Sequence, residues 1–297
     1  MNYLECPDYL ACTKKGQEIC GKYPFIRKSV IGKSVAGRNI YAFQIGKADE
    51  YVLFAGGFHG SEWLTVTLLY KFMEDLAQAV VGNGQVAGVE ARRVFTARGL
   101  IVVPCVNPDG TEIALHGAAG SGALAADIYR ISGGDFAHYN ANARGVDINH
   151  NFDAGWEKLH KLEQAAGIYG PAPRRYGGVR PESEPETVAV ADLCRNTNIC
   201  HALAFHSQGE VIYWDYGHYT PPKAVKMAGV MARSSGYELD APEGISVGGG
   251  FKDWFIKEFS RPGFTIEIGK GENPLPYTDF PEIYRKTGEM MMFSIML

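Results

Sequence analysis

The chain has 297 residues, of which 46% are hydrophobic, so it can bury one large core or two modest ones. The formal net charge of −4 at pH 7 argues against the basic surface with which proteins bind nucleic acid or an anionic membrane. The sequence contains no apolar run of about 18 residues, the length that a membrane-spanning helix needs.

The N-terminus and the cysteines indicate a cytoplasmic protein. Residues 1–6 contain no basic segment followed by an apolar one, so no export signal is recognised. The six cysteines lack the CxxC spacing of metal sites, and reduced thiols are expected in a chain without an export signal. The short basic pairs Arg92-Arg93 and Arg174-Arg175 are expected to be solvated surface.

The first half of the chain contains two strand-like runs and a helical stretch. The runs 40–45 and 51–54 are predicted to be neighbouring strands around the turn 46–50. A helix is predicted over 62–80, where large apolar side chains recur at helical spacing. Residues 1–35 are expected to be a small N-terminal extension packed on the core.

The second half continues the same alternation. Strands are predicted over 100–106, 200–206 and 264–268, and a helix is predicted over 182–195. The section 117–176 is poor in regular pattern and is interpreted as a long functional loop region. The whole pattern favours an α/β fold, a mixed sheet with helices on both faces, within a single domain.

The motif His59-Gly60-Ser61-Glu62 follows a predicted strand and a Gly-Gly turn. A histidine and a glutamate three residues apart at a strand end can converge on one point, and their nitrogen and oxygen atoms are ligands that zinc accepts. His206 ends another predicted strand and is the natural third ligand. In such sheets, ligands bind in the crevice beyond the strand ends, where His59, His206 and Glu267 are all expected.

Glu267 lies inside an apolar run that is typical of a strand. An ionised carboxylate is costly to bury without a partner, so Glu267 faces a pocket or a cation unless it lies on the wet face of an alternating strand. Near a metal ion, it could take a proton from water and pass it to a leaving amine.

An ordered set of motifs resembles the zinc carboxypeptidase family of metallopeptidases. The set contains HGSE at 59–62, VPCVNPDG at 103–110, RGVDIN at 144–149, His206-Ser207 and Asp253-Trp254. Together with the strand that carries a glutamate, these motifs span about residues 35–290. The resemblance implies an eight-stranded mixed sheet, one zinc ion and a peptide substrate.

The resemblance also implies roles for single residues. His59, Glu62 and His206 would bind zinc and leave a fourth position for water. Asp147 would accept a hydrogen bond from the first zinc histidine. Two catalytic roles would follow: Glu267 as the general base, and Arg144 as the cation that stabilises the tetrahedral oxyanion. The alternative for Arg144 is a surface arginine before a turn glycine.

Two positions depart from the family pattern. The family usually has Asn-Arg where this chain has Asn149-His150, and a histidine lacks the bidentate fork with which arginine grips a terminal carboxylate. Asn149 and His150 are nevertheless expected to contact substrate. Lys252 precedes Asp253-Trp254, at a position that is apolar or acidic in digestive members. It either meets a carboxylate on the leaving residue or extends to solvent.

Two further segments, 177–186 and 269–276, resemble bacterial members that act on cell-wall peptides. This branch implies hydrolysis of the amide between γ-D-glutamate and a diamino acid. The alternatives are a carboxypeptidase of broader specificity, an N-acyl amino acid deacylase on the same fold, and a peptide-binding module without catalysis. The aromatic run 213–216 is interpreted either as a wall of the cleft or as an ordinary strand and turn. The sequence does not indicate an oligomeric state.

Overall fold

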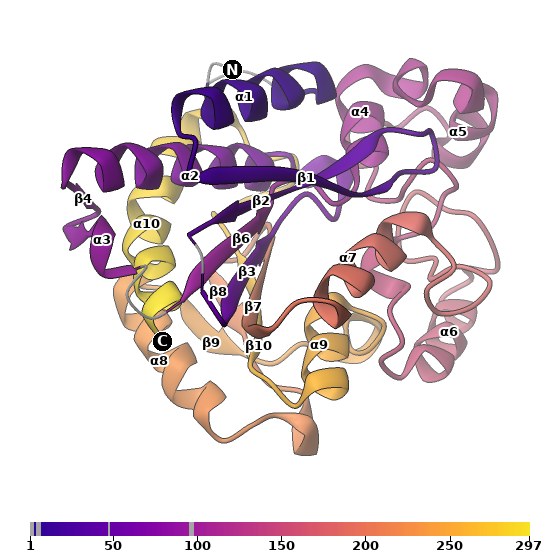
Figure 1. The fold of residues 1–297 in the computed structure, drawn as a ribbon. Coiled ribbons are helices and arrows are strands. Elements are labelled where there is room, and N and C mark those ends of the chain that lie inside the picture. Colours follow the sequence, from indigo (N-terminus) through magenta and orange to yellow (C-terminus); the bar gives the residue numbers. More distant parts are fainter. Residues whose placement is uncertain (1–2, 4–6, 47, 95–97) are drawn as a thin grey trace.

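A twisted mixed sheet forms the centre of the computed structural model, which describes residue 3 and residues 7–46, 48–94 and 98–297 (Figure 1). Within these residues the sheet has eight strands in the order β1-β2-β6-β3-β7-β10-β8-β9. The strands are β1 (Ile26–Lys33), β2 (Asn39–Ile45), β3 (Tyr51–Ala55), β6 (Gly99–Val103), β7 (Ile199–His206), β8 (Val211–Tyr213), β9 (Glu238–Asp240) and β10 (Gly263–Glu267). A separate short hairpin consists of β4 (Gln85–Val86) and β5 (Val89–Glu90).

Helices cover both faces of the sheet, which confirms the fold class expected from the sequence. The helices are α1 (Tyr9–Lys22), α2 (Leu64–Gly82), α3 (Ala91–Val94), α4 (Pro108–His116), α5 (Ala125–Ser132), α6 (Trp156–Ala165), α7 (Pro185–Arg195), α8 (Lys223–Ser235), α9 (Phe251–Phe259) and α10 (Phe280–Met296). Figure 1 shows α2, α8 and α10 on one side of the sheet and α7 and α9 on the other. Each face of the sheet has its own apolar core. Val52 and Phe54 of β3 pack into one core and Leu53 packs into the other, because successive strand residues point to opposite faces.

The prediction that strands 40–45 and 51–54 are neighbours is wrong. β6 lies between them, antiparallel to β2 and parallel to β3. All five residues of β6 are buried, so it belongs in the sheet interior. The chain leaves β3 through α2 and returns in β6, and such a parallel crossover places the new strand beside the one just left.

Two other segments differ from their sequence predictions. The section 117–176 contains α5 and α6, whose short amphipathic patterns are masked by the many glycines, alanines and asparagines around them. The helix predicted over 182–195 begins at Pro185, because Glu182 has a left-handed φ of 52°. Within the predicted extension 1–35, the described residues form α1 and the edge strand β1, which pairs with β2. Across the described part of the chain, no helix is long and apolar enough to cross a membrane.

Candidate metal centre

The exits of three adjacent parallel strands bring the candidate ligands together. β7 lies between β3 and β10, and all three run in the same direction. His206 is the last residue of β7, and its register partner Glu267 is the last residue of β10. After β3 the chain turns through Gly56-Gly57, and His59 immediately precedes a short 3-10 turn, η1 (Gly60–Glu62), of which Glu62 is the last residue.

Close packing fixes the turn that carries His59 and Glu62. A Cβ atom on Gly60 would lie 2.2 Å from the carbonyl oxygen of Gly110 and 2.5 Å from that of Tyr139, so only glycine fits. The hydroxyl of the next residue, Ser61, donates to Oδ1 of Asn140 at 2.6 Å. The turn is therefore anchored to the loop that runs past the strand ends.

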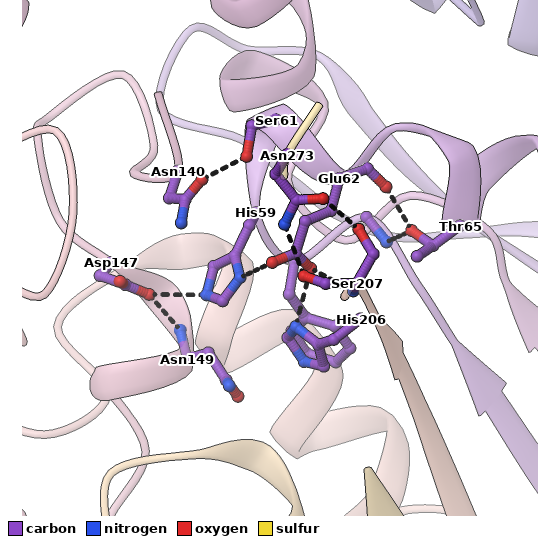
Figure 2. Close-up of polar contacts among 12 residues, drawn as sticks. His59, Ser61, Glu62, Thr65, Asn140, Asp147, Asn149, His206, Ser207 and Asn273 are labelled. Carbon is purple, nitrogen blue, oxygen red and sulfur yellow. Dashed lines mark hydrogen bonds and ion pairs between the residues drawn. The ribbon is translucent and has the colours of Figure 1, made fainter. Parts of the chain in front are cut away.

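His59, Glu62 and His206 point their side chains at one another (Figure 2). Nδ1 of His59 lies 2.7 Å from Oε1 of Glu62, and Nδ1 of His206 lies 3.0 Å from Oε2 of the same carboxylate. The possible ligand atoms of the three residues all lie within 4.8 Å of one another. The structure thus brings together the three residues that were expected to bind zinc.

Asp147 holds the ring of His59 from the opposite side. Its Oδ1 lies 3.1 Å from Nε2 of His59, and its Oδ2 accepts the backbone N–H of Arg175 at 2.8 Å. An Nε2–H that donates to a carboxylate leaves the lone pair of the ring on Nδ1, which faces Glu62. This is the contact expected of Asp147.

The electrostatics of the cluster favour a positive charge among the three ligands. Burial alone would lower the pKa of His59, but Glu62 and Asp147 raise it well above its usual value. Burial raises the pKa of Glu62, yet His59 and His206 outweigh burial and lower it to about 2. Two imidazole nitrogens and one carboxylate oxygen, gathered where a cation is stabilised, are a donor set that fits zinc.

Glu267 lies in the cleft beside the cluster and not on a solvated strand face. It lines a cavity of about 530 Å³ together with His59 and His206. Burial raises the pKa of its carboxyl well above the usual value, and the charge of Glu62 raises it further against the opposing effect of His59. Glu267 is therefore a carboxylate with a strengthened affinity for a proton, within the same cleft as the candidate ligands.

Arg144 does not reach this cleft. Its side chain is 55% exposed and pairs with Glu184 at 3.0 Å, and it lines a different cavity with Asp127 and Arg130. The expectation that it stabilises an oxyanion therefore has no geometric support. Arg144 and Asp147 belong to the same motif, but the chain turns at Gly145 and the two side chains line different cavities.

The arginines that line the cleft are Arg174 and Arg175. Both are exposed, as expected from the sequence, but two adjacent arginines in a segment without regular pattern carry no local signal that they border a site. Arg175 has a left-handed φ of 66°, and its N–H donates to Asp147. Its unusual backbone conformation is thus tied to the residue that orients His59.

The remaining predicted substrate-contact residues line the cleft, but their side chains already have partners. Asn149 accepts the N–H of Phe251 through Oδ1 at 2.9 Å, and Nδ1 of His150 lies 2.8 Å from Oε1 of Glu163. Lys252 is only 5% exposed and does not extend to solvent. Its ammonium donates to the Asp215 carbonyl at 2.6 Å and forms an ion pair with Asp253.

Several further cleft residues were not singled out from the sequence. They include Asn140, Asp240, which is the last residue of β9, and Glu243 on the segment after β9, whereas Tyr213 belongs to the aromatic run 213–216. Tyr213 therefore supports the interpretation of run 213–216 as part of a cleft wall. The cleft contains charges of both signs, from Arg174, Arg175, Lys252, Asp240, Glu243 and Asp253.

Comparisons with known proteins agree with this geometry. A family model described as zinc carboxypeptidase matches residues 14–290. The γ-D-glutamyl-L-diamino acid endopeptidase 1 of Lysinibacillus sphaericus is 36% identical over 281 residues, which are 94% of this chain and 69% of that protein. The uncharacterised protein YqgT of Bacillus subtilis is 32% identical over 96% of this chain and 76% of its own. Bovine thrombin-activatable fibrinolysis inhibitor, solved with a tick carboxypeptidase inhibitor, superposes with a TM-score of 0.76 at 18% identity, over 100% of this chain and 98% of that one.

Proposed function

We propose that this chain, which belongs to the zinc carboxypeptidase family and is a zinc peptidase, hydrolyses the amide bond between γ-D-glutamate and a diamino acid in cell-wall peptides. The relative from Lysinibacillus sphaericus is named for this linkage, and this chain covers 69% of its length. The observation that carries the substrate class is the mixed charge of the cleft. A diamino acid such as diaminopimelate has both an ammonium group and carboxylates, and the cleft offers Asp240 and Glu243 for the first and Arg174 and Arg175 for the second.

His59, Glu62 and His206 would hold the zinc ion, since their ligand atoms converge. Zinc, when bound, polarises the scissile carbonyl and makes the attacking water more acidic. Asp147 keeps Nδ1 of His59 available as a ligand by accepting a hydrogen bond from Nε2.

Glu267 takes a proton from the attacking water on a carboxylate oxygen and passes it to the amine that leaves. Its raised pKa strengthens the affinity for a proton that this role needs.

Mass spectrometry of the products from a defined peptide tests this function. The zinc-loaded protein is incubated with L-alanyl-γ-D-glutamyl-meso-diaminopimelate, with chelator-treated protein as the control. We expect free diaminopimelate and L-alanyl-D-glutamate from the zinc-loaded protein alone. Release of C-terminal residues from ordinary α-linked peptides, with the wall peptide left intact, would instead assign a carboxypeptidase of broader specificity.

A cytoplasmic location stays a prediction, and it would make fragments of wall peptides the substrates rather than intact wall. Immunodetection of the protein in separated cell fractions checks it. Recovery from the membrane or the external fraction would contradict the prediction.

A further inference from the structure

Segment 269–276, whose sequence resembles that of enzymes acting on wall peptides, does not line the cleft. Among the described residues that line it, none belongs to this segment. The segment instead contacts the chain just after β7, where the N–H of Gly209 donates to the carbonyl of Gly269 at 2.8 Å. Gly269 has a left-handed φ of 67°, and a Cβ atom there would lie 2.7 Å from Cδ1 of Leu275, so close packing fixes the turn. The segment is therefore held against the end of the strand that carries His206.

Asn273 of this segment binds Ser207, the residue after the candidate ligand His206 (Figure 2). Oδ1 of Asn273 accepts the hydroxyl of Ser207 at 2.7 Å, and Nδ2 donates to the Ser207 carbonyl at 2.5 Å. Because a carbonyl oxygen can only accept, this contact also settles which end of the amide faces it. Both polar groups of the Asn273 side chain therefore bind one residue, and Ser207 is only 5% exposed.

Ser207 in turn reaches the carboxylate of Glu62. Its backbone N–H donates to Oε2 of Glu62 at 3.3 Å. The other contacts of this carboxylate come from Nδ1 of His59 and Nδ1 of His206. A ring nitrogen that binds a metal ion uses its lone pair and cannot donate a hydrogen bond. Among the contacts in the described part of the chain, the Ser207 N–H is thus the one that still donates to Glu62 when both rings bind metal through Nδ1.

The backbone of Glu62 is held from a different side than its carboxylate. The hydroxyl of Thr65 donates to the carbonyl oxygen of Glu62 at 2.8 Å, and it accepts the N–H of Gly57 at 2.9 Å. These bonds tie the backbone to the turn after β3. The carboxylate is tied, through Ser207 and Asn273, to the segment after β10.

We propose that Asn273 is a positioning residue of the metal centre, which holds Ser207 so that the Ser207 N–H orients the Glu62 carboxylate for zinc. The proposal rests on the zinc site of the proposed function, but not on its substrate. A carboxylate that is oriented before the metal arrives loses less conformational freedom on binding, and an N–H bond to its charged form favours that form. Loss of a partner that contacts a ligand, and not the metal, typically weakens metal binding by about 10- to 100-fold.

Zinc competition with a chromophoric chelator measures the effect on the metal. We expect Asn273→Ala to weaken zinc binding about tenfold or more, because both bonds to Ser207 are lost. Ser207→Ala should weaken it less, since the carbonyl contact and the N–H remain. The matched control is Glu272→Ala, which removes an exposed side chain next to Asn273 and should leave the zinc affinity within about twofold.

An Asn273→Ala protein that binds zinc as tightly as the wild type would overturn the proposal. Thermal unfolding of the variants checks that they fold. If Asn273→Ala does not fold, an unchanged zinc affinity in Ser207→Ala would overturn the proposal in its place.

NMR of the Ser207 amide gives a readout that a merely structural role of Asn273 would not move in the same direction. His206-Ser207 is the one His-Ser pair in the sequence, so carbonyl carbon-13 in histidine and nitrogen-15 in serine select this amide. With excess zinc, we expect its proton to resonate downfield, as an N–H bound to a carboxylate does, and to move upfield in Asn273→Ala but not in Glu272→Ala. In Glu62→Gln the signal should lie upfield already, and adding Asn273→Ala should move it little further. A Ser207 signal unchanged in Asn273→Ala would refute the positioning role.

These measurements separate the inference from the function on which it rests. If the wall peptide is hydrolysed but Asn273→Ala binds zinc as the wild type does, the role of Asn273 is wrong and the function stands. If no wall peptide is hydrolysed but Asn273→Ala weakens zinc binding and moves the Ser207 signal, the substrate is wrong and the role of Asn273 stands.

Discussion

The pKa values of two carboxylates at the candidate metal site, Glu62 and Glu267, are shifted in opposite directions. The imidazoles of His59 and His206 lower the pKa of Glu62 to about 2, so Glu62 stays ionised as a ligand must. Within the described part of the chain Glu267 forms no such ion pair, and burial together with the charge of Glu62 raises its pKa well above the usual value. Environments that separate two carboxyl groups in this way are typical of a site where one binds and the other transfers protons.

Glu267→Gln should therefore keep zinc and lose turnover. The amide has nearly the same shape but cannot accept the proton of the attacking water, and general acid–base catalysis contributes about 10²- to 10⁴-fold to the rate. Elemental analysis measures the zinc, and a peptide hydrolysis assay measures kcat. The exposed Glu272, changed to glutamine, serves as the control. Turnover within about threefold of the wild type would remove Glu267 from the mechanism.

The arginines of the cleft should matter more to substrate than Arg144. We expect the double substitution of Arg174 and Arg175 by alanine to lower kcat/KM about tenfold or more, because charge-assisted contacts are lost. Arg144→Ala should leave kcat/KM within about threefold and lower stability instead, since the carboxylate of Glu184 is only 3% exposed and would lose its cation. Steady-state kinetics and urea unfolding distinguish these outcomes. A loss of kcat/KM greater than about threefold in Arg144→Ala would show that Arg144 acts on the substrate.

At the scale of elements, one carboxylate joins α7 to the segment that follows β1. Glu186, in the first turn of α7, accepts the backbone N–H of Val35 at 2.9 Å and Nδ2 of Asn142 at 3.1 Å. Burial raises its pKa to about 7, and the charge of Asp109 adds to this against the opposing hydrogen bonds. Burial at this junction therefore favours the folded state when Glu186 is protonated, although its two hydrogen bonds favour the carboxylate.

The stability of the fold should depend on pH through this residue. Since the pKa of Glu186 is higher in the folded state than in the unfolded one, its contribution is complete below about pH 4.5 and is lost as the pH rises through about 7. The loss is on the order of 3 kcal/mol from a shift of this size. Urea unfolding of metal-free protein measures it, and Glu186→Gln should lose correspondingly less stability over this range than the wild type. Parallel curves for the two proteins would exclude Glu186 as the cause.

At the scale of the whole molecule, the candidate metal site joins parts of the chain that are far apart in sequence. His59 and Glu62 follow β3, whereas His206 ends β7, nearly 150 residues later. An ion bound by all three would connect the exits of two central strands. Because an unfolded chain does not hold the three ligands together, binding of zinc is linked to folding.

Zinc should consequently stabilise the protein by mass action. Free zinc at about 100 times its Kd should raise the free energy of unfolding by about 2.7 kcal/mol, provided that the unfolded chain binds little metal. Chemical unfolding with and without chelator measures the difference, and His206→Ala should greatly reduce it. An equal zinc effect in wild type and variant would place the stabilising ion elsewhere.

The sequence by itself determined the fold class, and it singled out the candidate ligands and Glu267 from motifs that are a few residues long. A few residues are enough to recognise each of these patterns. They are apolar runs of strand length, a His-x-x-Glu motif at a strand exit, and a second histidine at another exit. The register of the strands then needs only to be parallel for His59, His206 and Glu267 to meet, and the structure has it so. The core strands predicted over 200–206 and 264–268 were accordingly placed within one residue.

Only the tertiary structure decided which charged residues face the cleft and which strands are neighbours. Arg174 and Arg175 lie in a segment without regular pattern, and their place in the cleft depends on a backbone contact of Arg175 with Asp147, 28 residues earlier. The position of β6 between β2 and β3 likewise follows from long-range packing. The direction of a side chain on a loop is set by contacts that are distant in sequence, and a local sequence pattern does not predict them.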